Sequence, residues 1–286
     1  MGNESFHFQI GSFKCIVVSD GTVAHSHPAQ ILFVNAPKER LEQVLRQHNI
    51  DPKKWEQDVS PYLSLLINTG QHRVLVDTGA GGLIPTTGRL IPNLKAEGIA
   101  PEDIDLVILT HGHPDHIGGN INSEGKTAFP NARYIMWKDE WDFWALEPSL
   151  AEQDVRQGAM ITIVRNHLLP IQDQLDLVDH ETEIVPGIRA VAAHGHTPGH
   201  ATVAITSSNK RLLYISDAVL HQIHLEQPDW YSAHDFAPEQ AVASRRRLLD
   251  WAATEKALGH AFHFPFPGLG YVTQKGEGWR WQPIKK

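Results

Sequence analysis

The feature that most constrains the fold of this chain is an apolar segment that runs directly into a histidine-rich loop. The stretch EDIDLVILTHGHPDHIGG holds an apolar run from Leu106 to Leu109, and three histidines and an aspartate follow between His111 and His116. A continuous apolar run of this length is typical of a strand that is covered on both faces. We therefore expect a buried strand that ends in a cluster of polar side chains.

The same pattern of a strand followed by a polar loop recurs along the chain. The stretch YLSLLINTGQHRVLVDTGAGG predicts two strands joined by a turn near Gly70 and followed by a glycine-rich loop. The stretches IRAVAAHGHTPGHATVAI and KRLLYISDAVLH predict further strands that end at polar residues. Helices are expected over 36–50 and 237–258, the second with a proline in its first turn and ending before Gly259.

These elements follow one another without a Gly/Ser-rich or Pro-rich linker. Strands that alternate with helices predict a layered α/β sandwich. The chain has 286 residues and is long enough to bury a sizeable core. We therefore expect a single domain over residues 1–286.

Charge and cysteine content narrow the classes of partner and location. The formal net charge of −8 argues against nucleic acid as a partner, and the short basic run at 245–247 is expected on a solvated helix face. Cys15 is the only cysteine and lies in an apolar run, which predicts a buried thiol and no intrachain disulfide. The N-terminal stretch MGNESFHFQIGSF lacks signal-peptide features, and no apolar run has the length of a membrane span. A cytoplasmic protein without a membrane partner is expected.

The spacing within the histidine-rich loop indicates a metal site. In His111-x-His113-x-Asp115-His116, the first two histidines can converge on one ion while the last two residues turn towards a second. Imidazole nitrogen and carboxylate oxygen suit zinc and related divalent ions. One loop cannot complete both coordination shells. Further candidate ligands stand at the ends of other apolar runs: His194, His196, His200, Asp217, His260 and His263.

Four motifs, in chain order, resemble those of the metallo-β-lactamase fold superfamily. They are THGHPDHIGG, HGHTPGH, YISDAV and HFPFPG, and the similarity extends from LLINTGQHRVLVDTGAGG to FHFPFPGLG. The resemblance implies an α/β fold built as a four-layer αβ/βα sandwich. It also implies a centre of two divalent metal ions, for which zinc is expected, although manganese, iron and cobalt accept the same ligands.

The resemblance also implies a ligand set. His111, His113 and His196 would hold one metal, Asp115, His116 and His263 the second, and Asp217 would bridge both. His196 is preferred because it opens the HTPGH motif, and His263 because it directly precedes FPFPG. We expect His194 and His200 to be packing or supporting residues, and Asp77 of the VDTG motif to orient the ligand loop.

A dinuclear centre implies hydrolysis by a metal-bridging hydroxide, with Asp115 and Asp217 as the catalytic candidates. Asp115 can also shuttle a proton to the leaving group. Ser216 is not surrounded by the G-x-S-x-G pattern of a nucleophilic serine. The alternative from another class is a non-catalytic metal-binding protein, but such a protein would be expected to lack some of these ligands.

The stretches HFPFPGLG, EQPDW and SRRRLLDWAA resemble the branch that contains methyl parathion hydrolase and related lactonases. This favours a small-molecule substrate, an acyl-homoserine lactone, an aryl lactone or a related ester, with phosphotriesters as the alternative. Candidates for the substrate pocket are Trp141, Trp144, His221, His224, Tyr231, Phe264 and Phe266. The aromatic segment 137–144 is also a candidate contact in a homodimer.

Overall fold

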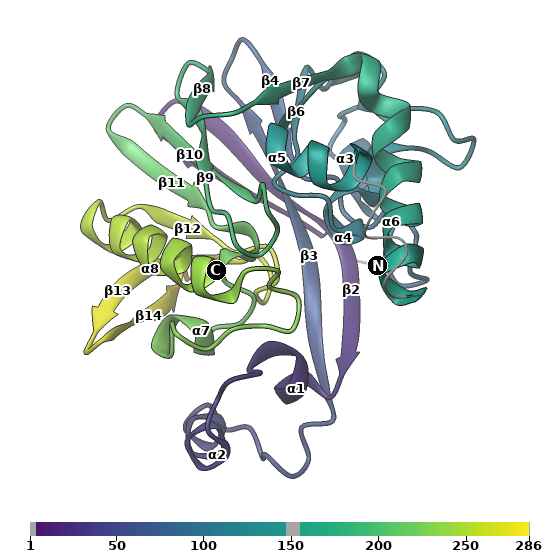
Figure 1. Ribbon diagram of the computed structural model, residues 1–286. Helices are drawn as coiled ribbons and strands as arrows, with labels where there is room; N and C mark the ends of the chain where they lie inside the picture. The colour runs from purple at the N-terminus through teal and green to yellow at the C-terminus, as the bar shows by residue number, and fades with distance from the viewer. Residues whose placement is uncertain (1–3, 147–154, 286) are drawn as a thin grey trace.

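The computed structural model describes residues 4–146 and 155–285, which form two seven-stranded sheets with helices on their outer faces (Figure 1). The strands of the first sheet lie in chain order: β1 (Ser5–Ile10), β2 (Phe13–Ser26), β3 (Gln57–Asn68), β4 (Arg73–Val76), β5 (Leu106–Ile108), β6 (Arg133–Trp137) and β7 (Leu175–Val178). Neighbouring strands pair antiparallel from β1 to β4 and parallel from β4 to β7.

The strands of the second sheet also follow chain order. They are β8 (Thr182–Val185), β9 (Ile188–Ala192), β10 (Ala201–Ser207), β11 (Lys210–Tyr214), β12 (Leu258–His260), β13 (Leu269–Lys275) and β14 (Gly278–Pro283). Only the β11–β12 pair among these is parallel, because the longest helix of the described chain, α8 (Pro238–Thr254), lies between those two strands in the sequence.

Helices cover the outer face of each sheet. The first sheet packs against α3 (Leu90–Ala96) and α6 (Val155–Leu168), and the second packs against α8. Shorter helices are α1 (Pro28–Leu32), α2 (Lys38–Gln47), α4 (Pro114–Ile117), α5 (Lys138–Trp141) and α7 (Ile223–Glu226). The predicted helices at 36–50 and 237–258 are thus present, in shorter form, as α2 and α8.

The core between the two sheets explains the continuous apolar runs. On β5, Ile108 packs into the core between the sheets, whereas Val107 packs into the core beneath α3 and α6. Both side chains are buried, as expected for a strand that is covered on both faces. The layers therefore run helix, sheet, sheet, helix, which confirms the predicted four-layer αβ/βα sandwich.

Between β2 and β3 the chain makes an excursion that carries α1 and α2 beyond the sheets (Figure 1). This excursion is anchored by its own small core, in which Phe33 and Leu45 meet Ile223 and Trp230. It is also tied by two backbone hydrogen bonds, from Val34 N–H to the carbonyl of Tyr231 and from Ala233 N–H to the carbonyl of Ile31. The excursion therefore brings α1 close to the segment that follows β11.

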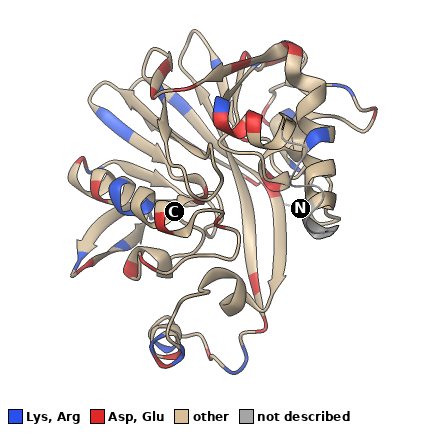
Figure 2. Cartoon of the chain, in the orientation of Figure 1, with Lys and Arg blue, Asp and Glu red and all other residues tan. Residues whose placement is uncertain are grey.

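The expectation of a solvated basic run is wrong for Arg245, which is 0% exposed. Its position on α8 places it on the same face as Ala241, Leu248 and Leu249, all of which are buried against the second sheet. Arg246 and Arg247 fall outside that face, where Arg246 is half-buried and Arg247 is exposed. Figure 2 shows that basic and acidic residues are interspersed over several elements, including α8.

None of the helices in the described residues combines the length and the apolar character that crossing a membrane requires.

Candidate metal centre

Among the described residues, two groups of side chains bring possible metal-binding atoms within 4.8 Å of one another. The first group is His111, His113, His196 and Asp217, and the second is Asp115, His116 and His263. The histidine-rich loop follows β5 of the first sheet, whereas His196, Asp217 and His263 follow β9, β11 and β12 of the second. The site therefore lies where loops from the two sheets meet.

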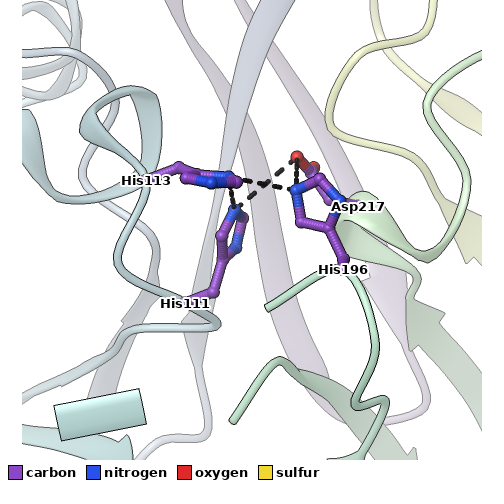
Figure 3. A group of neighbouring side chains, drawn as sticks. All are labelled: His111, His113, His196 and Asp217. Carbon is purple, nitrogen blue, oxygen red and sulfur yellow. Dashed lines mark hydrogen bonds and ion pairs between the residues drawn. The ribbon is translucent and has the colours of Figure 1, made fainter. Parts of the chain in front are cut away.

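In the first group, the nitrogen atoms of three imidazoles converge (Figure 3). His113 Nδ1 lies 3.0 Å from both His111 Nε2 and His196 Nε2. Asp217 Oδ2 lies 3.2 Å from His196 Nε2 and 3.6 Å from His111 Nε2. Ligands at the usual zinc distances in a tetrahedron stand about 3.3 Å apart, so these atoms have the spacing that one zinc ion needs.

Asp217 also faces the second group. Its Oδ1 atom lies 3.3 Å from His116 Nε2 and 3.2 Å from His263 Nε2. Asp115 Oδ2 lies 3.7 Å from His116 Nε2 and 3.6 Å from His263 Nε2. The two carboxylate oxygens of Asp217 are thus turned towards different groups.

Hydrogen bonds on the outer nitrogen atoms orient the rings. His116 Nδ1 donates to Asp77 Oδ2 at 2.8 Å, and His196 Nδ1 donates to Asp235 Oδ1 at 2.8 Å. His263 Nδ1 is hydrogen-bonded to Ser60 Oγ at 2.9 Å. Such bonds fix the tautomer of a histidine and leave Nε2 free to face a metal.

Asp77 holds more than one part of the ligand loop. Its carboxylate accepts hydrogen bonds from the backbone N–H and the hydroxyl of Thr110, and from the hydroxyl of Tyr214. Asp77 is fully buried and has a φ of 58°, in the left-handed region that is costly for a residue other than glycine. The surrounding bonds keep it there and direct its carboxylate at both Thr110 and His116.

Burial and neighbouring charges shift the pKa values of the site in opposite directions. Burial lowers the pKa of His111 and of His113 well below the ordinary value. Burial alone would raise the pKa of Asp217, but His116 and His263 outweigh it and hold that pKa well below its usual range. These shifts favour neutral imidazoles beside an ionised carboxylate, which are the forms that bind a metal.

His196 differs from these two histidines. Burial alone would lower its pKa, but hydrogen bonds to Asp217 and Asp235 raise the pKa to about 9. The carboxylates around the ring therefore attract positive charge to this position. A divalent cation would supply that charge in place of a proton.

A cavity of about 370 Å³ opens over both groups. Five members of the groups line it: His113, Asp115, His196, Asp217 and His263. Its aliphatic walls come from Ile31, Leu32, Leu83, Ile84, Met160, Ile163 and Leu220, and His25, Asp58 and His234 add polar atoms. The volume lies within the range typical of small-molecule sites.

Residues 58–260 match the sequence profile of the metallo-beta-lactamase superfamily. The chain belongs to this superfamily. The match confirms the superfamily that the four sequence motifs indicated.

Individual members of the superfamily are similar over most of the chain. The N-acyl homoserine lactonase AiiA of Bacillus thuringiensis subsp. kurstaki is 26% identical over 219 residues, which cover 69% of this chain and 79% of AiiA. The structure of AidC, a dizinc quorum-quenching lactonase in complex with a product, matches with a TM-score of 0.90 and 28% identity over 100% of this chain and 99% of AidC. AbOPH, a hydrolase in the beta lactamase superfamily, matches with a TM-score of 0.90 and 27% identity over the same shares of the two chains.

The other histidines of the superfamily motifs lie outside both groups. His200 is buried, with Nδ1 2.9 Å from the carbonyl of Ala193, and His194 packs its ring on Trp137. His260 is buried and stacks on Tyr214. The structure thus places His196 and His263, and not their neighbouring histidines, beside the other donor atoms.

The expectation that Trp141, Trp144, Phe264 and Phe266 line the substrate pocket is wrong. None of these four side chains lines the cavity. Trp144 is buried and donates its indole N–H to Glu140, and Phe264 is buried against Trp281. Trp141 and Phe266 pack against two different cores. Large aromatic side chains stabilise a fold chiefly by burying apolar surface. In this chain they do so in the hydrophobic cores and not in the cavity wall.

The three remaining pocket candidates, His221, His224 and Tyr231, also lie outside the cavity lining. His224 Nε2 donates to the carbonyl of Leu32 at 2.8 Å, and the His221 ring packs on Phe33. Tyr231 contributes backbone bonds to the same excursion. These residues contact α1 and the chain next to it. They therefore support the part of the cavity wall that Ile31 and Leu32 of α1 form.

Sequence reasoning missed Asp235 and Glu140, two buried acids beside the histidine motifs. Asp235 accepts the hydrogen bond from His196, and Glu140 accepts hydrogen bonds from the loops that carry His111 and His196. Asp235 is the only acid in AHDFAP, and Glu140 stands between Asp139 and Asp142 in WKDEWDF, and neither stretch has a spacing that signals a ligand. An acidic residue among aromatic residues was the only available signal for Glu140.

Proposed function

We propose that this chain is a dinuclear metal-dependent hydrolase that opens lactone rings, with N-acyl homoserine lactones as its substrates. The observation that carries the proposal is the position of Asp217, whose two oxygen atoms face separate groups of donor atoms beneath a largely aliphatic cavity. The activity named for AiiA and AidC supports the choice of substrate.

The residues fit a pair of divalent cations. His116 Nε2 and Asp217 Oδ1 are buried and make no hydrogen bond within the described part of the chain, although an ion would satisfy both. We propose that His111, His113 and His196 hold one ion, that Asp115, His116 and His263 hold the other, and that Asp217 holds both. Zinc suits these donors, and AidC is a dizinc enzyme.

When bound, two such cations supply a hydroxide nucleophile near neutral pH and Lewis acidity towards the lactone carbonyl. Asp217 fixes the spacing of the two groups through its two oxygen atoms. Asp115 lines the cavity and is placed to pass a proton to the alkoxide that ring opening leaves. Asp77 and Asp235 keep the imidazoles of His116 and His196 oriented through their Nδ1 atoms.

The cavity walls favour a substrate with an acyl chain. Aliphatic side chains from α1 and α6 face the same space as Asp115 and Asp217. Burying a methylene group against such walls contributes about 0.8 kcal/mol, and the walls also exclude water from the reacting carbonyl. His25, Asp58 and His234 offer hydrogen bonds to a polar group such as an amide.

The test is a hydrolysis panel on the zinc-loaded protein. The substrates are N-acyl homoserine lactones of increasing chain length, aryl lactones, aryl esters and a phosphotriester, each assayed with and without a chelator. We expect the acyl-homoserine lactones to give the highest kcat/KM and the chelator to abolish turnover. A phosphotriester rate far above every lactone rate would reverse the proposed order of substrates.

Variants of the centre control for contaminating activity. Asp217→Asn removes a charge shared by both groups, so we expect zinc content to fall and the rate to drop about 1000-fold or more. His263→Ala should lose the metal ion of the second group together with activity. His194→Ala should keep most of both, because this ring lies outside the donor groups. Two bound zinc ions without chelator-sensitive turnover of any substrate would instead favour a non-catalytic metal-binding protein.

A cytoplasmic location and a homodimer built on the aromatic segment stay predictions. Fractionation of the native cells and light scattering of the purified protein test them.

A further inference from the structure

Glu140 is a fully buried acid that joins two loops of the candidate metal centre. It lies on α5, and its Oε1 atom accepts hydrogen bonds from Gly112 N–H at 2.7 Å and from Trp144 Nε1–H at 2.6 Å. Its Oε2 atom accepts hydrogen bonds from the Thr197 hydroxyl at 2.6 Å and from Gly199 N–H at 2.9 Å. One carboxylate thus ties together backbone segments that are more than eighty residues apart in the sequence.

The two loops that Glu140 ties are those of the first donor group. Gly112 stands between His111 and His113, and Thr197 directly follows His196. All three imidazoles of the group are therefore next to a residue that donates to Glu140. The rings of the second group have other supports, since His116 is bound to Asp77 and His263 to Ser60.

The packing around Glu140 requires glycine on both loops. A Cβ atom on Gly112 would lie 2.5 Å from Trp144 Cδ1, and one on Gly199 would lie 2.2 Å from Glu140 N. Both distances are far below van der Waals contact. The absence of side chains at Gly112 and Gly199 lets the two loops approach α5 closely enough for direct backbone hydrogen bonds.

The hydrogen bonds indicate that Glu140 is ionised. Burial raises the pKa of this carboxyl, and the bonds from Thr197, Gly112, Trp144 and Gly199 oppose that shift. Three of these partners are N–H groups that can only donate, and an ionised carboxylate accepts from all four. Charge-assisted bonds of this kind are stronger than those between neutral groups.

We propose that Glu140 is a positioning residue that holds the three imidazoles of the first donor group at metal-binding distances, and so sets the affinity of that metal ion separately from the other. The inference rests on the two-metal centre of the proposed function. It predicts that loss of the Glu140 charge weakens the site formed by His111, His113 and His196 and spares the site formed by Asp115, His116 and His263.

The test measures zinc affinity by competition with a chromophoric chelator. Glu140→Gln keeps the shape of the side chain but replaces one acceptor oxygen with a donor, so one of the two loops must lose its bonds. We expect affinity for one of two zinc ions to fall by about 10- to 100-fold, as for other groups that orient metal ligands. Thr197→Val removes a single bond and should produce a smaller loss at the same site.

Two single-site backgrounds identify which ion is affected. In His263→Ala, where the first group is intact, Glu140→Gln should weaken the remaining ion. In His196→Ala, where the second group is intact, it should change the affinity little. Equal losses in both backgrounds, or wild-type affinity for both ions in Glu140→Gln, would overturn the proposal.

A stability-matched control separates positioning from general loosening. Leu94→Ala creates a cavity beneath α3 without removing any of the hydrogen bonds to Glu140, and should lower the melting temperature without a site-specific loss of zinc. In the metal-free protein, hydrogen exchange at the amides of Gly112 and Gly199 should accelerate in Glu140→Gln and not in Leu94→Ala. The same zinc loss in Leu94→Ala would overturn the proposal.

These outcomes are distinct from failure of the proposed function. A wild-type protein that binds two zinc ions but opens no lactone contradicts the lactonase proposal alone. Unchanged zinc affinity and unchanged amide exchange in Glu140→Gln contradict the role of Glu140 alone.

Discussion

At the scale of the residue, the histidines of the centre differ in the nitrogen atom that they turn inward. His116, His196 and His263 use Nδ1 for an outer hydrogen bond and direct Nε2 at Asp217. His113 is the exception, because its Nδ1 faces the other two nitrogen atoms of the first group. The side chain of His113 therefore approaches from a different direction, and it also lines the cavity.

His260 provides a test of how burial affects stability. Neither of its ring nitrogen atoms has a hydrogen-bond partner in the described residues, and burial lowers its pKa from 6.5 to about 3. Between these values the unfolded chain binds a proton that the folded chain does not, so stability falls as the pH falls through this window.

We therefore expect His260→Phe, which retains an aromatic ring beside Tyr214, to reduce the pH dependence of unfolding. Between pH 8 and pH 5, the free energy of unfolding of the metal-free wild type should fall by about 2 kcal/mol more than that of the variant. Urea denaturation in the presence of a chelator measures both curves. Parallel curves for the two proteins would contradict this account of His260.

At the scale of the element, the segment between β11 and α8 is held by Arg245. Its Nε donates to the carbonyl of Ala218 at 2.7 Å, and Nη1 donates to the carbonyls of Pro228 and Trp230. Its Nη2 lies 3.8 Å from Asp235 Oδ2, and burial lowers the pKa of Arg245 to about 10. This arginine thus links α8 to the acid that orients His196.

Replacing Arg245 should be much more costly than replacing its neighbour in the basic run. Arg245→Met removes the donor to the carbonyls of Ala218, Pro228 and Trp230 and the positive charge beside Asp235, and we expect the free energy of unfolding to fall by about 3–5 kcal/mol. Arg246→Met breaks an exposed pair with Asp229 and should cost less than about 1 kcal/mol. Denaturant unfolding of the two variants compares them directly, and similar losses would refute the structural role of Arg245.

The cavity wall on α6 allows a second test at this scale. Ile163 lines the cavity, whereas Leu169 lies just beyond α6, has a similar exposed fraction and does not line it. Ile163→Trp should raise KM for a long-chain acyl-homoserine lactone about tenfold, which corresponds to about 1.4 kcal/mol, and change a short-chain substrate little. Steady-state kinetics with Leu169→Trp as the control should show wild-type KM values. An equal effect on all chain lengths would place the acyl chain elsewhere.

The strands and the donor atoms of the histidine-rich loop were predictable because their signals are local, whereas His196, Asp217 and His263 were selected through the family resemblance. Leu106 to Leu109 and His111 to His116 adjoin in the sequence, so the buried strand and its ligand loop are visible together. The cavity walls were not predictable, because Ile31, Leu83 and Ile163 belong to segments far from the histidine motifs. Their proximity depends on how the excursion after β2 and the helix α6 pack, which no short pattern encodes.

The same limit applies to charged residues. Arg245, Arg246 and Arg247 are consecutive and chemically identical, yet the first is buried, the second half-buried and the third exposed. The apolar face of α8 determines which arginine is buried. The run of three arginines in the sequence does not reveal which one lies on that face. Glu140 is a similar case, because only the fold brings the residues that donate to it together from two distant loops.

At the scale of the whole molecule, the donor atoms are divided between the two sheets. His111, His113, Asp115 and His116 follow β5, and the other three donors follow strands of the second sheet. The central core is also built from both sheets, with Val17 and Leu65 on one side and Val203 and Leu212 on the other. We therefore propose that both sheets unfold together as a single domain.

Removal of metal should lower the stability of this domain, but the two sheets should still unfold in one transition. A site occupied at a hundredfold excess over Kd stabilises the folded state by about 2.7 kcal/mol, so we expect a chelator to lower the melting temperature by about 5–10 °C per ion. Calorimetry should show one transition both with and without zinc. Two separate transitions in the metal-free protein would contradict the single domain, and an unchanged melting temperature would contradict tight metal binding.

The division of the donor atoms between the sheets also has a consequence for how the gene can change. Each sheet is encoded by a continuous stretch, but neither stretch encodes a complete donor group, since the first group needs His111 and His196 and the second needs His116 and His263. A substitution that shifts one sheet alters ligand distances on both ions. Selection for an intact centre therefore acts on the relative placement of the two sheets, and compensating substitutions are expected to pair one stretch of the gene with the other.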